Sequence, residues 1–444
     1  MSETIVALAS GVGRGGVAVI RVSGLQSWES LEALCSGPGF QHRTAQLSIL
    51  KHPDSRETLD QALVLPFKAP ASYTGEDVVE YHVHGGRAVI NSVIDVLSVQ
   101  KGHRLAEPGE FTRRAFENGK MDLTAAEAIA DLVDAETQAQ KIQALGQMDG
   151  RLSDLYEGWM ERLKKTLAHL EADIEFPDED LPEGGAPEIS QNVASLIRDV
   201  GDHLDDNQRG ERLRDGIQVA VIGAPNAGKS SLINALAQRD VAITSDVAGT
   251  TRDVIEVHLD LKGYPVILAD TAGLRPEQLG NEGQDAIESE GIRRAIERAE
   301  SADIKILLFD GAALMPDPHT LNLIDDRSIL VTNKMDQAEA KILIDTSLPL
   351  SVETGEGLQG LLDVLFSKID ALIGTRETPS LTRQRHRQHV ENALESLRRS
   401  QKADLPELMA EDLRLATRDL GRIIGRVDVE DLLDVIFKDF CIGK

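Results

Sequence analysis

Gly223-Ala-Pro-Asn-Ala-Gly-Lys-Ser230 organises the central part of this chain, between the β-branched run IQVAVIG and the helical pattern SSLINALA. A strand, a glycine-rich turn ending in Lys-Ser and a helix together form a phosphate-binding loop. Its backbone N–H groups and the helix N-terminus can hold phosphates. Lys229 can reach the β and γ oxygens, and the Ser230 hydroxyl can bind Mg²⁺.

Three further motifs follow at the spacing of a GTP-binding domain. Gly249-Thr250-Thr251 places Thr251 as a second hydroxyl ligand of Mg²⁺, and Asp270-Thr-Ala-Gly273 ends a hydrophobic strand with a carboxylate near the metal. Asn333-Lys334-Met-Asp336 ends a later strand. The predicted nucleotide contacts are Asn226, Ala227, Gly228, Lys229, Ser230, Ser231, Ser245, Asp246, Val247, Ala248, Gly249, Thr250, Thr251, Asp270, Thr271, Ala272, Gly273, Asn333, Lys334 and Asp336.

Asp336 indicates which base is bound. A carboxylate can accept hydrogen bonds from N1–H and the exocyclic amine of guanine, and adenine offers no such pair of donors. A site of this kind would leave a buried carboxylate unpaired with ATP, so GTP is the expected nucleotide. Ser351-Val352 stands where many such domains carry Ser-Ala beside the base.

The group that orients the attacking water is less evident. Small GTPases place a glutamine directly after the glycine of the Asp270–Gly273 motif, but Leu274 stands here and cannot hydrogen-bond water. Acidic residues follow it, and spacing alone does not choose among them. An arginine finger is not evident either, although Arg252 and Arg275 lie near these motifs.

The pattern along the chain predicts a multidomain protein. Strand and helix patterns alternate between residues 212 and 375, as in an α/β domain built on a parallel sheet. Helical periodicity flanks this region at 119–211 and 376–444, which predicts one all-α helical domain made of two separated segments. Short β-branched runs and turns in residues 1–118 predict an α+β N-terminal domain. The acidic, proline-containing stretch 176–187 is expected to be an exposed loop, with helix resuming near 189.

Composition restricts the partners. The net charge of −27 disfavours a general nucleic-acid surface, so any RNA contact should be local. The best local candidate is the basic run Arg383, Arg385, His386, Arg387 and His389, for which a solvated helix face is the alternative. Only two cysteines occur, and no long apolar run does, which favours a reducing compartment without a membrane span. We expect a cytoplasmic protein.

Several long motifs resemble one family, the bacterial and organellar tRNA modification GTPases called MnmE or TrmE. The resemblance covers nearly the whole chain. It depends on SYTGEDVVEYHVHGG at 72–86, PGEFTRRAFENGKMDLTAAEA at 108–128, GAPNAGKSSLINAL, SDVAGTTRD, DTAGLR and the terminal Cys441-Ile-Gly-Lys444.

The resemblance implies how hydrolysis proceeds. Members of the family use K⁺ in place of an arginine finger, because a monovalent cation can neutralise charge between the β and γ phosphates. The positions implied for K⁺ are Asn226, Ser245, Val247 and Thr250. The resemblance also identifies Glu288 as the catalytic glutamate that orients water. Lys229 of the phosphate loop is the other predicted catalytic residue.

A reduced folate, 5-formyltetrahydrofolate or a relative, is the second ligand that the resemblance implies. The matching positions are Arg21, Glu80, Lys120 and Lys444. A carboxylate suits the paired N–H donors of a pterin, and cations suit the glutamate tail of folate. Cys441 is expected either to face the same pocket or to be a buried inert thiol.

The implied activity is addition of a carboxymethylaminomethyl or aminomethyl group at C5 of the wobble uridine of tRNA. The implied partner is the FAD-dependent protein MnmG (GidA), in a heterotetramer, and the implied dimer forms through the N-terminal domain. The alternative is a GTP-dependent assembly factor or switch with no role in base chemistry.

Three other patterns are rejected as sites or signals. Gly11-Val-Gly13-Arg-Gly-Gly16 is followed by a strand pattern, VAVIRV, where a dinucleotide site requires a helix. His82 and His84 alternate on a predicted strand without an identifiable third metal ligand, so ordinary strand residues are favoured. The C-terminal CIGK fits a prenylation signal poorly because it ends in Gly-Lys.

Overall fold

A computed structural model of the chain describes residues 3–11, 13–35, 39–175, 186–239, 241–243, 256–270, 300–337, 344–374, 379–427, 429–438 and 440–443, of which 186, 270 and 430–432 are described by their backbone alone. Contacts divide the chain into two compact units. The first comprises Met1–Ala130, Met148–Met160 and Thr417–Lys444, and the second comprises Asp131–Gln147 and Glu161–Ala416.

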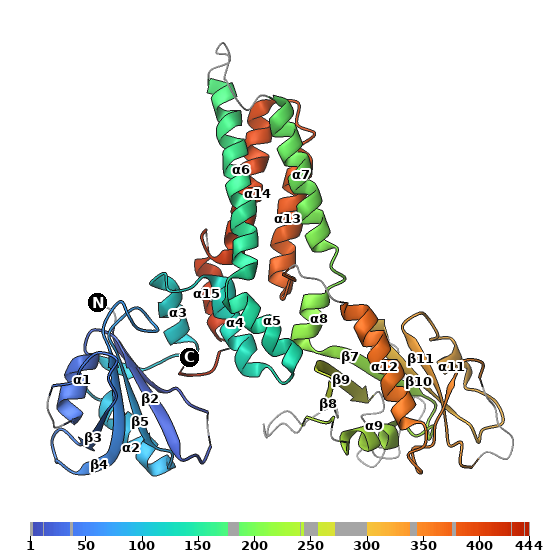
Figure 1. The fold of residues 1–444 in the computed structure, drawn as a ribbon, viewed down its shortest axis with the longest axis horizontal. Coiled ribbons are helices and arrows are strands. Elements are labelled where there is room, and N and C mark those ends of the chain that lie inside the picture. Colours follow the sequence, from blue (N-terminus) through green and yellow to red (C-terminus); the bar gives the residue numbers. More distant parts are fainter. Residues whose placement is uncertain are drawn as a thin grey trace, which may run out of the picture. The chain divides into compact units, whose positions relative to one another are not determined.

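The first unit is built on a six-stranded sheet, coloured blue in Figure 1, with strand order β3-β4-β5-β2-β1-β6. All neighbouring strands run antiparallel except β1 and β6. Its strands are β1 (Thr4–Leu8), β2 (Val17–Ser23), β3 (Gln46–Lys51), β4 (Thr58–Phe67), β5 (Val78–His84) and β6 (His103–Leu105).

Helices cover one face of this sheet, and the other face carries polar residues on β2 and β5 and exposed apolar ones on β3 and β4. Helices α1 (Ser27–Leu34) and α2 (Arg87–Ser98) pack on alternate strand residues such as Ile20, Val64 and Tyr81, all of which are fully buried. Because side chains alternate along a strand, Arg21, Glu80 and His82 point to the opposite face.

The first unit also contains α3 (Glu110–Glu117), the 123–130 part of α4 (Leu123–Asp134), the 151–160 part of α6 (Arg151–Glu175), the 417–424 part of α14 (Pro406–Ile424) and α15 (Glu430–Lys438). Leu123 of α4 and Phe437 of α15 share a small apolar core. The chain then continues to Ile442, which pairs antiparallel with Pro108. The C-terminal residues therefore lie against the start of α3.

The second unit contains another six-stranded sheet, with order β12-β11-β10-β7-β9-β8. Every pair is parallel except β8 and β9. The strands are β7 (Ile217–Gly223), β8 (Glu256–Leu261), β9 (Tyr264–Asp270), β10 (Ile304–Asp310), β11 (Ser328–Asn333) and β12 (Leu348–Pro349).

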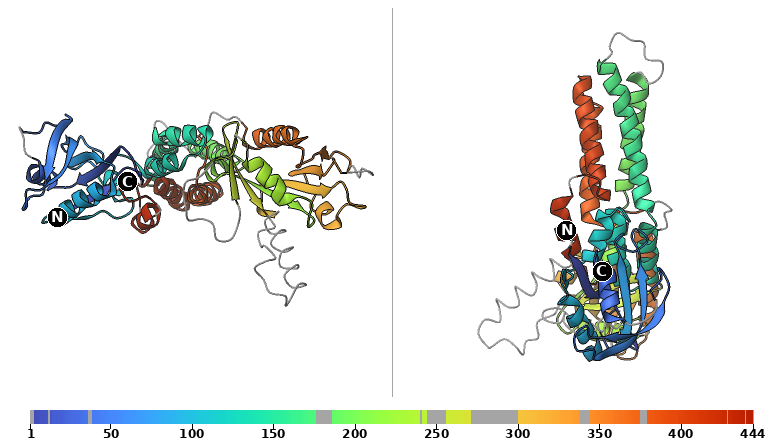
Figure 2. Two further views of the ribbon diagram at one scale, coloured as in Figure 1. Left: turned by 90° about the horizontal axis from the view of Figure 1, so that it is seen from below. Right: turned by 90° about the vertical axis from the view of Figure 1, so that its left-hand side faces the viewer.

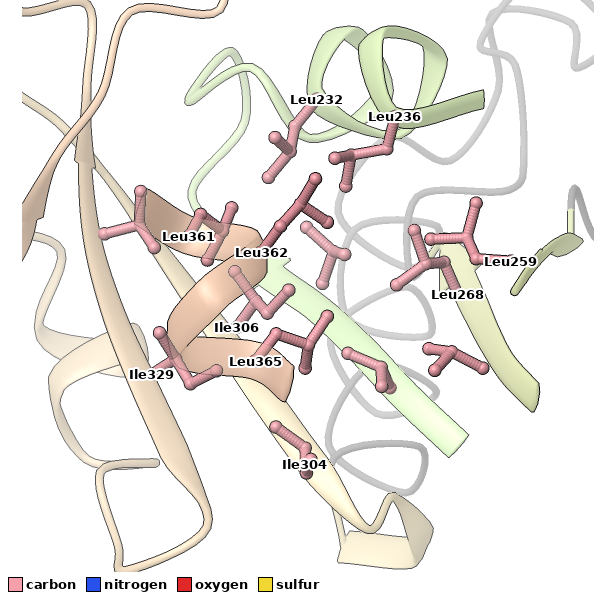
Figure 3. Packing of buried hydrophobic residues seen from close by; sticks show 14 of the residues in the cluster. Leu232, Leu236, Leu259, Leu268, Ile304, Ile306, Ile329, Leu361, Leu362 and Leu365 are labelled. Carbon is pink, nitrogen blue, oxygen red and sulfur yellow. The ribbon is translucent and has the colours of Figure 1, made fainter. Parts of the chain in front are cut away.

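Central strands of this sheet are buried on both faces, so their sequences are nearly continuous apolar runs. On one face α9 (Lys229–Ala237) and α12 (Leu358–Ile373) pack against the strands. Figure 3 shows Leu232 and Leu236 of α9 and Leu365 of α12 directed into the same core as Ile306. This core fixes α9, and with it the loop that precedes it.

The remaining helices of the second unit form a bundle and a connection to the sheet. Within this unit, α7 lies alongside α13 (Figure 1), and Figure 2 gives two further views of the bundle helices. The helices are α5 (Gln138–Met148), the 161–175 part of α6 (Arg151–Glu175), α7 (Ala186–Leu204), α8 (Arg209–Asp215), α13 (Gln384–Ser400) and the 406–416 part of α14 (Pro406–Ile424), with the short α11 (Pro318–Leu321) beside β10.

The predicted fold class is confirmed: an α+β N-terminal region, helices from two separated segments and an α/β region between them. The helix expected from 189 begins earlier, at Ala186. Most of the predicted 176–187 loop lies outside the described residues. The domain boundaries at 118, 211 and 375 stay a prediction.

Candidate nucleotide site and the polar face of the N-terminal sheet

The phosphate-loop motif joins β7 to α9. Gly223 ends β7 so close to β10 that a Cβ atom there would lie 2.3 Å from the Leu308 carbonyl oxygen. Gly228 precedes α9 with φ +101°, and Asn226 has φ +65°. Positive φ values of this kind turn successive backbone N–H groups inward, which is the geometry of an anion-binding loop.

Lys229 and the two serines after it begin α9. Lys229 Nζ donates to the carbonyl oxygens of Gly223 and Ala224, at 2.8 and 3.0 Å, so its ammonium group lies over the loop. Ser230 and Ser231 are exposed in the first turn, where backbone N–H groups lack helical partners and the helix dipole favours an anion. These residues can receive phosphate oxygens, and the Ser230 hydroxyl is a ligand type that suits Mg²⁺.

Asn333 connects the phosphate loop to the segment after β12. Its Nδ2 donates to the Ala227 carbonyl oxygen at 2.9 Å, and its Oδ1 accepts from the Val352 backbone N–H at 3.1 Å. The side chain is 3% exposed. Asn333 is therefore a buried clamp between two loops that are far apart in the sequence.

Asp336 is oriented by Ser351. The Ser351 hydroxyl donates to Asp336 Oδ1 at 2.6 Å and accepts from the Thr354 backbone N–H at 3.2 Å. This hydrogen bond from Ser351 lowers the pKa of the Asp336 carboxyl. Asp336 is exposed in this structure. Discrimination against adenine would require the base itself to cover the carboxylate.

Two residues have a larger part in this site than the sequence indicated. Ser351 is the direct partner of Asp336, whereas its motif alone indicated only proximity to the base. Asp310, at the end of β10, accepts a hydrogen bond from Lys334 Nζ at 2.6 Å. The sequence could have indicated Asp310, because it stands at the carboxyl end of a parallel strand, as Asp270 does, and ligands bind at that edge of such sheets.

The other half of the predicted site lies almost entirely outside the described residues. Asp270 is the last residue of β9, and only its backbone is described. The predicted contacts that lie outside the described residues are Ser245, Asp246, Val247, Ala248, Gly249, Thr250, Thr251, Thr271, Ala272 and Gly273, together with Leu274 and Glu288.

The structure brings Arg21 and Glu80 together on the polar face of the first sheet. They are cross-strand partners, and Arg21 Nε donates to Glu80 Oε1 at 2.9 Å. The guanidinium carbon of Arg21 lies 5.1 Å from the ring centroid of Tyr73 and 5.6 Å from that of Phe111. An ion pair beside two aromatic rings can bind a flat, polar ring system.

Lys120 belongs to the same neighbourhood through the 70–75 segment. Its Nζ donates to the Pro70 carbonyl oxygen at 3.0 Å, and its aliphatic stem lies beside Gly75. Tyr73, which contacts Arg21, is part of that segment. Lys120 is exposed, as a residue that receives the acidic end of a ligand must be.

The C-terminal residues reach the edge of this polar face. The Cys441 carbonyl oxygen accepts a long hydrogen bond from the Gly109 N–H at 3.4 Å. Gly443 lies against the end of β1, where a Cβ atom would be 2.0 Å from the Leu8 carbonyl oxygen. The alternative of a buried thiol at Cys441 is wrong, because this residue is exposed. Lys444 lies outside the described residues.

The glycine run at 11–16 precedes a strand of the first sheet, and the two histidines lie on another. Residues after Gly16 form β2 and not a helix. His84 Nδ1 lies 2.7 Å from Asp60 Oδ1, and His82 Nε2 lies 3.6 Å from Glu80 Oε2. Within the described ranges no group of three or more His, Cys, Asp or Glu side chains could hold a metal ion.

Three residues of the basic run at the start of α13 make contacts within the second unit, and a local RNA contact there stays a prediction. Arg387 pairs with Asp206 and Glu211, Arg383 pairs with Asp131, and His386 is fully buried. The hydrogen bond with Glu211 raises the pKa of Arg387 above its usual value. Carboxylates of the second unit thus neutralise the charges of Arg383 and Arg387.

No helix in the described part of the chain combines the length and the apolar character needed to cross a membrane.

Comparison with known proteins adds the family. A family model described as the GTP-binding protein TrmE N-terminus matches residues 4–120, and one described as the MnmE helical domain matches residues 123–441. The chain is 53% identical over 450 residues to the tRNA modification GTPase MnmE of Paramagnetospirillum magneticum, with 100% of both chains covered. It is 51% identical over 459 residues to the protein of that name in Rhodospirillum rubrum, covering 100% of this chain and 99% of the relative.

A more distant relative and a solved structure complete the comparison. Identity to the MnmE protein of Rickettsia rickettsii is 45% over 449 residues, with 100% of both chains covered. The G domain of the T. maritima FeoB iron transporter is 26% identical, with a TM-score of 0.25, over 36% of this chain and 99% of that one. On the two family models and the full-length relatives, the chain belongs to the MnmE family of tRNA modification GTPases.

Proposed function

We propose that this chain hydrolyses GTP as a step in tRNA modification, with addition of a carboxymethylaminomethyl or aminomethyl group at C5 of the wobble uridine. The observation that carries the GTP part is the Asn333 clamp, which joins the phosphate loop at Ala227 to the segment that holds the Asp336–Ser351 pair. The tRNA part is supported by relatives of full length that carry the name tRNA modification GTPase.

The phosphates and the base of the nucleotide bind at opposite ends of this site. The α9 N-terminus and Lys229 receive the phosphates, and Asp336 receives the N–H donors of guanine. Mg²⁺ would be held by Ser230 and Thr251, with the Asp270 carboxylate near the metal. Bound Mg²⁺ supplies charge neutralisation at the β and γ phosphates.

Hydrolysis depends on K⁺ and on Glu288 in this proposal. Asn226 supports the K⁺ part because it is exposed on the loop in a left-handed conformation. The other proposed K⁺ positions, Ser245, Val247 and Thr250, and the proposed water-orienting Glu288 lie outside the described residues.

Two measurements test the hydrolytic step. GTPase activity should be higher in K⁺ than in Na⁺ at equal ionic strength, and equal rates would remove the K⁺ proposal. Glu288→Ala should bind GTP normally and lose turnover. Retained turnover would assign the role to another acidic residue.

A reduced folate such as 5-formyltetrahydrofolate is the proposed one-carbon donor. The polar face of the first sheet supports it, since Glu80 can accept the pterin N–H donors while Tyr73 and Phe111 offer ring faces. Lys120 and Lys444 are proposed for the glutamate tail. Cys441 is proposed to take part in the one-carbon chemistry, and its exposure is compatible with that role.

A homodimer formed through the N-terminal domain is supported by apolar residues on the same sheet face. Leu47 and Leu63 are cross-strand partners and are 63% and 41% exposed, and Ile49 is 45% exposed. Exposed apolar groups of this kind mark interaction surfaces. Assembly with an MnmG-type FAD protein into a heterotetramer, and a cytoplasmic location, stay predictions from the family resemblance.

One genetic experiment tests the whole proposal. Nucleosides of tRNA from a strain lacking this protein should lack the C5-modified uridine by mass spectrometry. The unchanged protein should restore it and Lys229→Ala should not, whereas the control Lys164→Ala, at an exposed position of α6, should restore it. Intact modification in the deletion strain, with no affinity for 5-formyltetrahydrofolate, would favour the assembly factor or switch.

A further inference from the structure

His82 lies beside the Arg21–Glu80 pair on the polar face of the first sheet. It stands on β5, two residues after Glu80, and its cross-strand partners are Val19 on β2 and Leu63 on β4. Both partners are apolar, so neither side chain can hydrogen-bond an imidazole. The next polar group along the strand is His84, which is paired with Asp60.

The imidazole of His82 contains a buried nitrogen without a hydrogen-bond partner. Among the described residues, no hydrogen bond reaches Nε2, although this atom is shielded from solvent. Its acidic neighbour is Glu80 Oε2, at 3.6 Å. Buried polar atoms are nearly always paired, so an unpaired one requires an explanation. A shift of less than about 1 Å would bring these two atoms into hydrogen-bond distance.

Glu80 is thereby placed between two donors. Arg21 donates to its Oε1 at 2.9 Å, and His82 faces its Oε2. A carboxylate has about four lone-pair positions, two on each oxygen. Arg21 occupies one lone-pair position on Oε1, and His82 would occupy one on Oε2. The remaining position on each oxygen can then accept one of the paired N–H donors of a pterin.

We propose that His82 is a positioning residue of the folate site: its Nε2–H bonds Glu80 Oε2 when the pterin binds and holds the plane of the carboxylate for recognition. This inference rests on the proposed folate function and deepens it. The ligand class is a reduced pterin with adjacent ring N–H and amino donors. The pairing fixes the orientation of Glu80, which a single bond from Arg21 would leave free to rotate.

Titration of the full-length protein with 5-formyltetrahydrofolate tests the proposal. His82→Leu should weaken binding about tenfold, because Glu80 loses a charge-assisted hydrogen bond. His82→Gln keeps an N–H donor of similar reach and should stay within about threefold of the unchanged protein. The matched control is His84→Gln, which alters the exposed neighbour paired with Asp60 and should leave the affinity unchanged.

A double-mutant cycle separates positioning from simple packing. Glu80→Gln alone should weaken binding strongly, and His82→Leu added to it should cause no more than about a twofold further loss, since the two residues act together. Equal losses for His82→Leu and His82→Gln would overturn the proposal. The proposal would also be overturned if the losses caused by Glu80→Gln and His82→Leu simply added in the double variant.

An NMR measurement covers the case in which His82→Leu does not fold. In the unsubstituted protein the imidazole nitrogen signals of His82 should shift when 5-formyltetrahydrofolate is added. If the protein binds the folate and these signals do not change, the role of His82 is overturned and the folate proposal stands. Absence of any binding by the unsubstituted protein would instead overturn the folate proposal, and this inference with it.

Discussion

Arg387 of α13 and Glu211 of α8 form a bidentate ion pair in the second unit. Arg387 Nε lies 2.8 Å from Glu211 Oε1, and Nη2 lies 2.7 Å from Oε2. The same guanidinium donates to Asp206 Oδ1 at 2.7 Å and to the Leu204 carbonyl oxygen at 3.0 Å. One side chain thus connects the end of α7, the start of α8 and α13.

Helix α8 leads directly into β7, the strand that carries the phosphate loop. Arg212 on this helix donates to Asp303 Oδ1 at 2.6 Å, and Asp303 Oδ2 accepts from the Gln218 N–H at 3.0 Å. Gly210 packs so tightly that a Cβ atom would lie 2.0 Å from the Leu381 carbonyl oxygen. Partly buried polar contacts and the close packing of Gly210 therefore fix the junction between helices and sheet.

Arg387→Ala should destabilise the second unit by about 3 kcal/mol, because it leaves the carboxylates of Asp206 and Glu211 without their main cation. Urea unfolding followed by circular dichroism would show this as a lower midpoint. Arg398→Ala is the control, since Arg398 is exposed on the same helix, and it should change stability by less than about 0.5 kcal/mol. Equal effects of the two substitutions would contradict the role given to this ion pair.

His203 makes the same region sensitive to pH. Burial lowers the pKa of its imidazole from 6.5 to about 4, although the nearby Asp206 opposes the shift. The unfolded chain then binds a proton below pH 6.5 that the folded chain does not bind until about pH 4. This contribution to stability is complete above pH 6.5 and is lost as the pH falls toward 4.

His203→Gln should therefore reduce the loss of stability between pH 7 and pH 5, by about 2 kcal/mol at most. Urea unfolding of both proteins at the two pH values measures the difference. His319→Gln, at an exposed position, is the control and should follow the unchanged protein. An identical pH dependence for His203→Gln and the unchanged protein would show that the imidazole does not titrate in this way.

Local patterns predicted the strands and loops of the site well, because each depends on neighbouring residues. The run before Gly223 gave the correct strand, and the Lys229 and Asp336 motifs lie at strand and helix ends as expected. Strand β8 was missed because it is an edge strand with three polar residues in six, Glu256, His258 and Asp260.

Contacts between distant residues could not be predicted in this way. Asn333 and Ala227 are 106 residues apart, and no periodicity in the sequence relates them. The partners of the basic run at α13 could not be predicted for the same reason. Sequence shows the charge of Arg387 but not the carboxylates of Asp206 and Glu211, which lie 181 and 176 residues away.

Ser351→Ala should weaken GTP binding about fivefold without changing the fold, because Asp336 loses the hydroxyl that orients it toward the base. Fluorescence titration with a labelled guanine nucleotide measures this. Ser351→Thr keeps a hydroxyl and should recover part of the affinity. The loss should be smaller for inosine triphosphate, which lacks the exocyclic amine and so makes one bond fewer to the carboxylate. Equal losses for both nucleotides would indicate that Ser351 acts on the fold of the loop.

Gly228→Ala should abolish tight nucleotide binding through the Asn333 clamp. The added Cβ would lie 2.3 Å from Asn333 Nδ2, and the φ of +101° is strained for any residue with a side chain. Asn333 must then move and lose its bond to Ala227, so GTP affinity should fall at least about tenfold, with a loss of stability of about 2 kcal/mol.

Gly360→Ala provides the matched control for that substitution. Gly360 lies within α12, and an added Cβ would meet no atom within 4 Å. Alanine in a helix is favoured over glycine by about 0.5–1 kcal/mol, so this variant should be slightly more stable and should bind GTP normally. Calorimetric titration with GTP and thermal unfolding of both variants measure the two effects separately. Normal GTP affinity in Gly228→Ala would mean that Asn333 can leave the loop without consequence, and the clamp would then have no part in binding.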